Sequence, residues 1–284
     1  MRLATFNDHR LGVVRDGTIV DVTEALGNRQ VLFPLTAMHH VIYDYEELAP
    51  QLRARAEAGP AQPLGDVRLM APLPHPTKIV AVGLNYKAHS IEMGYGPKPA
   101  PEPEIFLKSP GSVIGPGGSI QLPDMPGRVF HHECELAFVV RSRLDSCPAS
   151  QAMDAIFGYT MLIDVTVRGQ GDRCFRKSMK GFTPIGPWIV TADEVPNPEN
   201  LDIKLWVNDE LRQHANTNDL IWSIPEVIEY TSRHMILTPG DVFTTGTPAG
   251  VGPLAPGDVV RIEIESIGSM TVSVTSSAAG PAAA

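Results

Sequence analysis

Hydrophobic and polar residues alternate with a period of two through most of the chain after residue 78. Runs such as KIVAVGL, ECELAFVV, FGYTMLIDVTV, LDIKLWVN and DVVRIEIESIG are short, rich in β-branched or aromatic residues, and bounded by turn residues. Such runs predict strands. One clear helix, SIPEVIEYTSRHMI, interrupts them, with Ser223 as cap and Glu226 three residues later. Strands and helices do not alternate, so we expect a mainly β fold with a few helices, of the α+β class.

The first part of the chain has a different pattern. LGVV, the turn RDG and TIVDV predict a hairpin within residues 1–22, and residues 44–59 have helical spacing. A proline-rich, extended connector then spans residues 60–78. We therefore predict a small N-terminal α+β domain over residues 1–72 and a strand-rich domain over residues 73–284.

Composition and charge narrow the class of protein. With 43% hydrophobic and 19% charged residues, the 284-residue chain is typical of a folded soluble protein. A formal charge of −9 argues against a nucleic-acid partner, and no apolar run is long enough to span a membrane. The N-terminus turns polar too early for a secretory signal, and the three cysteines lack metal or disulfide spacing. We expect a cytoplasmic protein.

The stretch RVFHHECELAFVV places two glutamates inside an otherwise apolar strand. At a period of two, Glu133 and Glu135 share one face with Ala137 and Val139, and the opposite face is apolar. Two buried carboxylates this close repel each other, so one must protonate or both must face a cation. The alternative is an edge strand on which both point to solvent.

A third carboxylate lies in FGYTMLIDVTV. The apolar face of this run holds Phe157, Tyr159, Met161, Ile163 and Val165. Asp164 falls on the other face with Thr160 and Thr166, where an acid inside a strand has poor β propensity. Three carboxylates without paired Cys or His describe a site for a hard cation, Mg²⁺ or Mn²⁺, with positions left for water or substrate oxygens.

A histidine and two lysines add candidate chemistry. NYKAHSIEMG predicts a short helical turn on which His89 and Glu92 can meet at i, i+3. A carboxylate that orients a histidine gives a general base, although an exposed helical pair is the commoner arrangement. Lys177 or Lys180 can contact a substrate carboxylate or lie in solvent. The glycine-rich TTGTPAGVG lacks both nucleotide-binding patterns, so we reject a nucleotide site.

Together these stretches resemble the fumarylacetoacetate hydrolase family in its bacterial single-chain form. The resemblance covers roughly residues 73–275, and the small N-terminal domain is also of the family's type. It rests on the order and spacing of GLNYKAHSIEMG, ECEL, GYTMLIDVTVR, KSMKGFTPIGPW and SIPEVIEYTSRHMILTPGDVFTTGTPAGVG. The resemblance implies a mixed β-sandwich or roll as the catalytic domain.

The resemblance also implies a role for each candidate residue. The family's ligands for one divalent cation, Mg²⁺ or Mn²⁺ with Ca²⁺ able to substitute, match Glu133, Glu135 and Asp164. Its catalytic dyad matches His89 and Glu92.

The family lysine matches Lys177 and not Lys180, because Lys177 lies seven residues before Pro184 of the Pro-Ile-Gly-Pro turn. The positions expected to bind substrate are Arg168, Gly246 and Thr247.

Three positions depart from the family pattern. Ile163 stands where the family usually has asparagine, and Gly169 and Lys180 stand where it usually has aspartate. No metal ligand is lost. Two missing acids and an added lysine make the surroundings of the site more positive. The substrate therefore need not be one that is usual for the family.

The expected reaction is hydrolysis of a C–C bond in a 2,4-dioxo acid, an acylpyruvate or fumarylpyruvate-like compound, through a metal-bound enolate. Water activated by His89 and Glu92 would attack the distal carbonyl. Isomerisation or hydration of 2-hydroxy-dienoates such as 2-hydroxyhepta-2,4-diene-1,7-dioate, and decarboxylation of oxaloacetate, are the alternatives. A non-catalytic binding protein is a third alternative, which the dyad disfavours because a binder has no use for it.

Assembly is the last expectation. The strand-rich domain has too few helices to cover both faces of its sheets, so apolar surface is left for a second copy. Family members are generally dimers through this domain. We expect a homodimer with the N-terminal domain peripheral to the contact.

Overall fold

The largest of three β-sheets runs through both regions that the sequence distinguishes. The computed structural model describes residues 1–29, 36–97 and 100–277, and within them this sheet has eleven strands. Ten follow the order β4-β3-β2-β1-β13-β11-β10-β16-β5-β6, and β7 pairs with β13. In chain order they are β1 (Arg2–Phe6), β2 (Arg10–Arg15), β3 (Thr18–Asp21), β4 (Ala61–Pro63), β5 (Ile79–Gly83), β6 (Glu104–Lys108), β7 (Val113–Ile114), β10 (Cys134–Val140), β11 (Ile156–Ile163), β13 (Thr183–Thr191) and β16 (Val242–Thr244).

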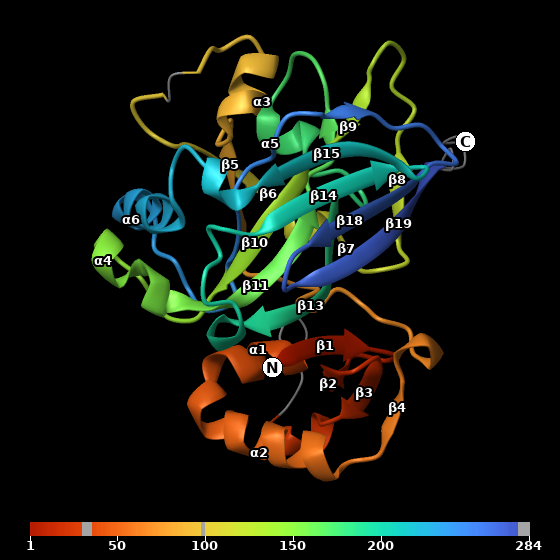
Figure 1. Cartoon of the computed structure of the whole chain (residues 1–284), viewed down its shortest axis with the longest axis vertical. Helices are drawn as coiled ribbons and strands as arrows, with labels where there is room; N and C mark the ends of the chain where they lie inside the picture. The colour runs from red at the N-terminus through yellow and green to blue at the C-terminus, as the bar shows by residue number, and fades with distance from the viewer. Residues whose placement is uncertain (30–35, 98–99, 278–284) are drawn as a thin grey trace, which may run out of the picture.

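The N-terminal strands and two helices form one end of the molecule (Figure 1). The predicted hairpin is confirmed, because β2 and β3 are antiparallel and turn at Asp16 and Gly17, both with positive φ. The helix predicted over residues 44–59 is also confirmed as α2 (Tyr45–Ala58), which follows α1 (Ala37–Tyr43). Strand β1 pairs with β13, so the two regions share a sheet as well as a connector. The division at residue 72 stays a prediction.

A five-stranded sheet packs against one face of the central strands. It has the order β15-β14-β18-β19-β8. Leu136 and Phe138 of β10 belong to the same apolar core as Leu205 and Ile262 from this sheet, whereas Ala137 packs with the N-terminal strands and helices. The alternation predicted for β10 is therefore confirmed, and both of its faces are buried. The five strands are β8 (Ser119–Leu122), β14 (Asp202–Val207), β15 (Glu210–Asn216), β18 (Val259–Ile264) and β19 (Gly268–Ser276).

A β-bulge changes the face of one residue in β11. Val139 pairs with Gly158 but Val140 pairs with Ile156, which leaves Phe157 as the extra residue. The prediction that Phe157 shares a face with Tyr159 is therefore wrong. The ring of Phe157 instead points to the N-terminal region and meets the Tyr45 ring edge-on, 5.1 Å between centroids.

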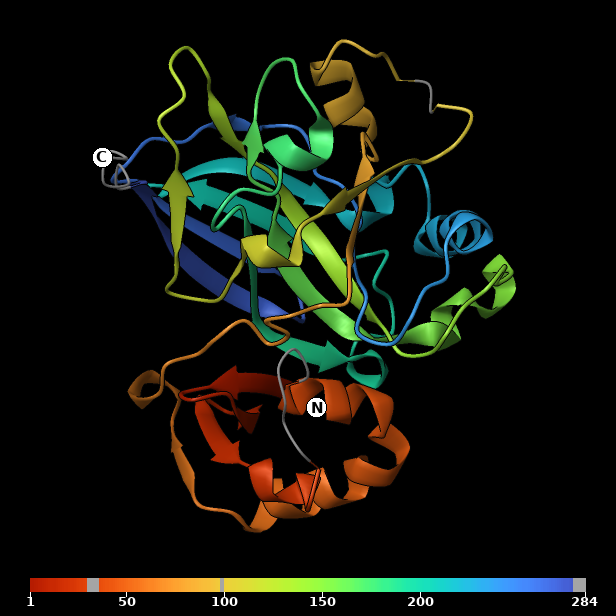
Figure 2. The same cartoon turned by 180° about the vertical axis from the view of Figure 1, so that it is seen from behind.

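Short elements cover the end of the central strands that lies away from the N-terminal region (Figure 2). Helix α6 has the predicted capping box between Ser223 and Glu226. None of the helices in the described ranges has the length and apolarity needed to cross a bilayer. The third sheet consists of β9 (Phe130–His132), β12 (Thr166–Val167) and β17 (Gly252–Pro253), and the other helices are α3 (Lys87–Glu92), α4 (Ala149–Ala152), α5 (Arg173–Arg176) and α6 (Ile224–His234).

Candidate active site

Three acidic side chains meet where the central strands end. Glu133 lies between β9 and β10, Glu135 lies in β10, and the amide of Asp164 donates to the carbonyl oxygen of Glu133 at 2.8 Å. One carboxylate oxygen from each lies within 4.8 Å of the others, and all three residues are buried. The alternative of a solvent-facing pair on an edge strand is therefore wrong. Asp164 follows the last residue of β11, so the prediction that it lies inside a strand is also wrong.

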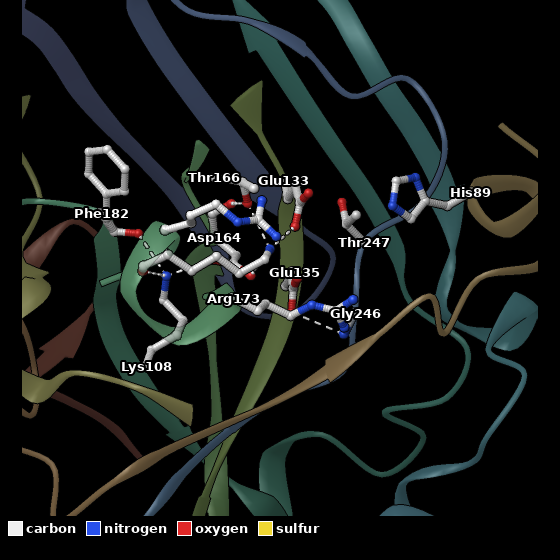
Figure 3. A network of polar contacts seen from close by, with 12 residues as sticks. His89, Lys108, Glu133, Glu135, Asp164, Thr166, Arg173, Phe182, Gly246 and Thr247 are labelled. Atoms are coloured by element: carbon white, nitrogen blue, oxygen red, sulfur yellow. Dashed lines mark hydrogen bonds and ion pairs between the residues drawn. The ribbon is translucent and has the colours of Figure 1, made fainter. Parts of the chain in front are cut away.

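Protein cations compensate this negative charge. The Nζ of Lys177 lies 2.6 Å from Oε2 of Glu133 and 2.6 Å from Oδ2 of Asp164. Nη2 of Arg168 lies 2.8 Å from Oε1 of Glu133. Of the two candidate lysines, Lys177 is thus the one at the site, and Lys180 is exposed. Figure 3 shows the contacts between these groups.

Lys108 is a further cation of the site that sequence reasoning missed. Its Nζ donates to Oδ1 of Asp164 at 2.6 Å and to the carbonyl oxygens of Lys177 and Phe182, and the side chain is fully buried. Burial lowers the pKa of Lys108, although Asp164 opposes this shift. A signal was present in the sequence: at a period of two, Lys108 shares a face with the buried Phe106.

The two glutamates differ in their electrostatic surroundings. Burial raises the pKa of Glu133, but Lys177 and Arg168 outweigh it and lower the pKa to about 2. Burial and the carboxylates of Asp164 and Glu133 raise the pKa of Glu135 to about 8. Glu135 has no ion pair within the described part of the chain, and its Oε2 accepts a hydrogen bond from the amide of Gly246 at 3.0 Å. One of the three acids therefore lacks a positive partner.

The three carboxylates fit a hard divalent cation. They supply oxygen ligands from a buried, rigid frame of strand ends, and such oxygens are what Mg²⁺ and Mn²⁺ prefer. A cation beside Glu135 would compensate the one carboxylate that no lysine or arginine pairs with. Glu133, Glu135 and Asp164 are the residues that would hold it.

His89 and Glu92 form a hydrogen-bonded pair at the edge of the same cavity. Nδ1 of His89 lies 2.8 Å from Oε2 of Glu92, and the amide of Gly250 donates to Oε1 of Glu92 at 2.9 Å. The side chain of His89 is only 5% exposed, so it is not a surface helical pair. Because the carboxylate can only accept, Nδ1 carries the proton and Nε2 is left as an acceptor.

The predicted substrate-binding residues lie in different positions around the cavity. Thr247 and Arg168 line it together with His89, the acidic triad and Lys177. Figure 3 shows Thr247 between His89 and Glu133 in that view. The amide of Gly246 is engaged with Glu135, so the substrate-binding role expected for Gly246 stays a prediction.

Gln213 of β15 is a second residue that sequence reasoning missed. Its Oε1 accepts from the amide of Cys134 at 3.0 Å, and its Nε2 donates to the carbonyl oxygen of Pro248 and to Oγ1 of Thr247, both at 2.8 Å. The backbone partners fix the orientation of this buried amide. Oγ1 of Thr247 must therefore accept, and its own hydrogen stays available. In the sequence, Gln213 is one polar residue among the mostly exposed positions of β15, so its pattern did not predict this contact.

Comparisons with known proteins find similar chains over nearly the full length. The family model for the C-terminal part of fumarylacetoacetate (FAA) hydrolase matches residues 78–275. The maleylpyruvate hydrolase of Aquipseudomonas alcaligenes is 38% identical, over 97% of this chain and 100% of the relative. The crystal structure of a maleylpyruvate hydrolase from Sphingobium sp. SYK-6, in complex with manganese(II) and pyruvate, is 43% identical with a TM-score of 0.88, and the match covers 97% of this chain and 99% of that one.

An isomerase is also similar over the full length. The 5-carboxymethyl-2-hydroxymuconate delta-isomerase of Mycobacterium smegmatis is 34% identical with a TM-score of 0.75, and the match covers 98% of this chain and 100% of that one. A buried three-carboxylate site for a divalent cation, faced by a histidine–carboxylate pair, defines the protein as an enzyme of the metal-dependent class. The chain belongs to the fumarylacetoacetate hydrolase family.

Binding of Mn²⁺ should release a proton near neutral pH. The pKa of Glu135 is raised to about 8, so this carboxyl is mostly protonated at lower pH and must ionise to bind the metal. The apparent affinity should therefore rise by up to about tenfold per pH unit as the pH approaches that pKa, and level off above it. Calorimetric titration in two buffers of different ionisation enthalpy measures the released proton.

The Glu135→Gln variant, which has no such proton, is the matched control and should bind Mn²⁺ weakly without release. An affinity independent of pH in the wild-type protein would contradict the prediction.

Proposed function

We propose that this enzyme hydrolyses a C–C bond of a dicarboxylic 2,4-dioxo acid of the maleylpyruvate type. The observation that carries the proposal is the His89–Glu92 pair on one side of a cavity whose other side holds the acidic triad and Lys177. Isomerisation needs no group to activate water, whereas hydrolysis does. The higher TM-score to a maleylpyruvate hydrolase than to the isomerase, at higher identity, supports the same choice.

The divalent cation, when bound, supplies a Lewis acid that polarises the substrate's oxo group and offsets negative charge that develops there. The protein supplies the proton chemistry. Nε2 of His89 accepts a proton from a water molecule, whose oxygen forms a bond to the distal carbonyl carbon. The C–C bond between that carbon and the pyruvyl methylene then breaks, and the methylene carbon takes up a proton. The products are a carboxylic acid and pyruvate. With maleylpyruvate as the substrate, the carboxylic acid is maleate.

Glu92 and the loop behind it orient the base. Glu92 holds the Nδ1 proton of His89 with one oxygen, and the amide of Gly250 holds the other oxygen. The imidazole is thereby kept in the tautomer that leaves Nε2 free, which a general base requires. Lys177 and Arg168 place positive charge on the opposite wall, where substrate oxygens and developing charge are stabilised.

Replacing His89 by alanine should lower kcat by about 10²–10⁴-fold, the usual size of a general-base contribution. The affinity for Mn²⁺ should stay close to that of the wild type, because His89 is not a proposed ligand. Release of pyruvate from maleylpyruvate and from fumarylpyruvate, measured with a coupled dehydrogenase, provides the assay. The exposed His9, changed to alanine, is the matched control.

Two outcomes would contradict this role of His89. Full turnover by His89→Ala would remove it from the chemistry. A loss of Mn²⁺ binding equal to the loss of turnover would make it a metal ligand.

Gln213 acts as a positioning residue in the same proposal. Because its Nε2 donates to Oγ1 of Thr247, the threonine hydroxyl is directed to donate its hydrogen into the cavity. His132 supports this arrangement from the far side, since Nδ1 of His132 lies 3.0 Å from Oε1 of Gln213. Burial lowers the pKa of His132 to about 4, so the ring is neutral at physiological pH and donates one hydrogen.

Changing Gln213 to glutamate replaces the Nε2 donor by an acceptor, which would draw the Thr247 hydrogen away from the substrate. We expect kcat/KM to fall by about 10–100-fold, the value of one hydrogen bond to a charged group. Thr247→Val should cost a similar factor, and the double variant should cost no more than either alone. The thermal shift on Mn²⁺ binding reports that the metal site is intact.

Losses that multiply in the Gln213→Glu/Thr247→Val double variant would show that Gln213 acts independently of Thr247, and would contradict its positioning role. Thr247→Ser, which keeps the hydroxyl, is the matched control and should retain most of the activity.

We also propose that the enzyme is a homodimer through its strand-rich region. Apolar side chains remain exposed there, among them Leu107 on β6 and Phe175 on α5, which is 67% exposed. These two elements contact each other, so their exposed side chains lie in one region of the surface. Light scattering at micromolar concentration should give twice the 30.7 kDa mass of one chain. A mass of one chain in active protein would contradict the proposal.

A further inference from the structure

Arginines gather on one wall of the cavity. Arg168, Arg173 and Arg176 all line it, and they come from the segment between Asp164 and Lys177. Arg173 and Arg176 are three residues apart in α5, so their side chains lie on one face of that turn. Neither Arg173 nor Arg176 has a part in metal binding or water activation in the proposed function.

The arginines of this wall differ in how they are compensated. Arg168 faces Glu133 at 2.8 Å, and Arg173 faces Glu104 at 2.5 Å. Arg176 donates only to backbone carbonyls, from Nη1 to Val167 at 2.7 Å and from Nε to Gly171 at 3.1 Å. Within the described part of the chain, no carboxylate lies within ion-pair distance of its guanidinium group.

The neighbouring guanidinium groups affect the pKa of Arg176. Burial and the nearby guanidinium groups of Arg173, Arg168 and Arg128 lower the pKa of Arg176. The group stays charged at any physiological pH, because an arginine starts from a pKa above 12. Asp172 opposes this shift without forming an ion pair with Arg176, so the positive charge of Arg176 is only partly compensated.

Gly169 leaves room for a further cation beside this wall. It has φ +104°, and a Cβ at this position would lie 2.4 Å from Nη1 of Arg128. Arg128 uses this space to donate to the carbonyl oxygens of Arg168 and Gln170. The aspartate that the family usually has at this position is thus replaced by a neighbouring cation.

The net charge of the whole cavity also favours an anionic group on the substrate. Lys108, Lys177 and Arg168 already match the charge of the three carboxylates in number, although none of them pairs with Glu135, so a bound divalent cation leaves the cavity with excess positive charge. Phe106 lies near a cation at each end of the cavity, since its ring centroid is 5.1 Å from Nζ of Lys177 and 5.6 Å from Cζ of Arg173. A substrate with a carboxylate at each end would place one by the metal ligands and the other by α5.

We propose that Arg176, together with Arg173, forms the subsite for the second carboxylate of a dicarboxylic substrate, and that this subsite makes the enzyme prefer diacids to monocarboxylic acylpyruvates. The inference rests on the proposed function, which it makes more specific. Arginine suits the task because its planar group binds a carboxylate through two parallel hydrogen bonds. The backbone bonds of Arg176 hold the group in place before the substrate arrives.

The test compares two substrates in each variant, fumarylpyruvate as the diacid and acetylpyruvate as the monoacid. In Arg176→Gln, the ratio of kcat/KM for the diacid to that for the monoacid should fall by about 10–100-fold, as expected for lost bonds to a charged group. Arg176→Lys should restore part of the ratio. Arg143→Gln, which removes an exposed arginine outside the cavity, is the matched control and should leave the ratio unchanged.

A second readout does not depend on turnover. Maleate titrated into the Mn²⁺-loaded protein should bind, and Arg176→Gln should weaken this binding by a similar factor. If no dioxo acid is hydrolysed but maleate binding still depends on Arg176, the subsite stands and the proposed function is wrong. An unchanged substrate ratio in Arg176→Gln, or maleate binding that does not depend on Arg176, overturns the subsite.

Discussion

Three carboxylates buried at the ends of the central strands impose the constraint on which the rest of this structure depends. A charge removed from water costs several kcal/mol unless an opposite charge or hydrogen bonds compensate it. The protein meets this cost for Glu133 and Asp164 with Lys108, Lys177 and Arg168. It leaves Glu135 with only a backbone amide, and that deficit is what a divalent cation removes.

The remaining architecture serves to bring these groups together from distant parts of the chain. The five-stranded sheet buries one face of β10, the N-terminal strands and helices bury the other, and short elements cover its end. The base comes from α3, its orienting partner is tied to the loop at Gly250, and the donor that directs Thr247 comes from β15. Backbone groups hold Glu92 and Gln213, the side chains that orient His89 and Thr247, which favours preorganised positions over adaptable ones.

Charge outside the metal site is a second feature of this cavity. Gly169 leaves room for Arg128, and Arg176, in the segment between Asp164 and Lys177, has no ion-pair partner among the described residues. The same fold serves a hydrolase and an isomerase among the similar structures. Differences in substrate can then arise at the walls of the cavity, and in this chain one wall is rich in arginine.

The sequence by itself determined the strand-rich class, the acidic triad and the His89–Glu92 pair, because each depends on local periodicity or on motif spacing, whereas the choice of Lys177 came from the resemblance to the family. Tertiary structure alone decided the rest. The bulge that turns Phe157 to the other face depends on pairing with β10, and the roles of Lys108 and Gln213 depend on partners 56 and 34 residues away. Local pattern contains no information on such partners, since burial and long-range pairing arise only when the sheets assemble.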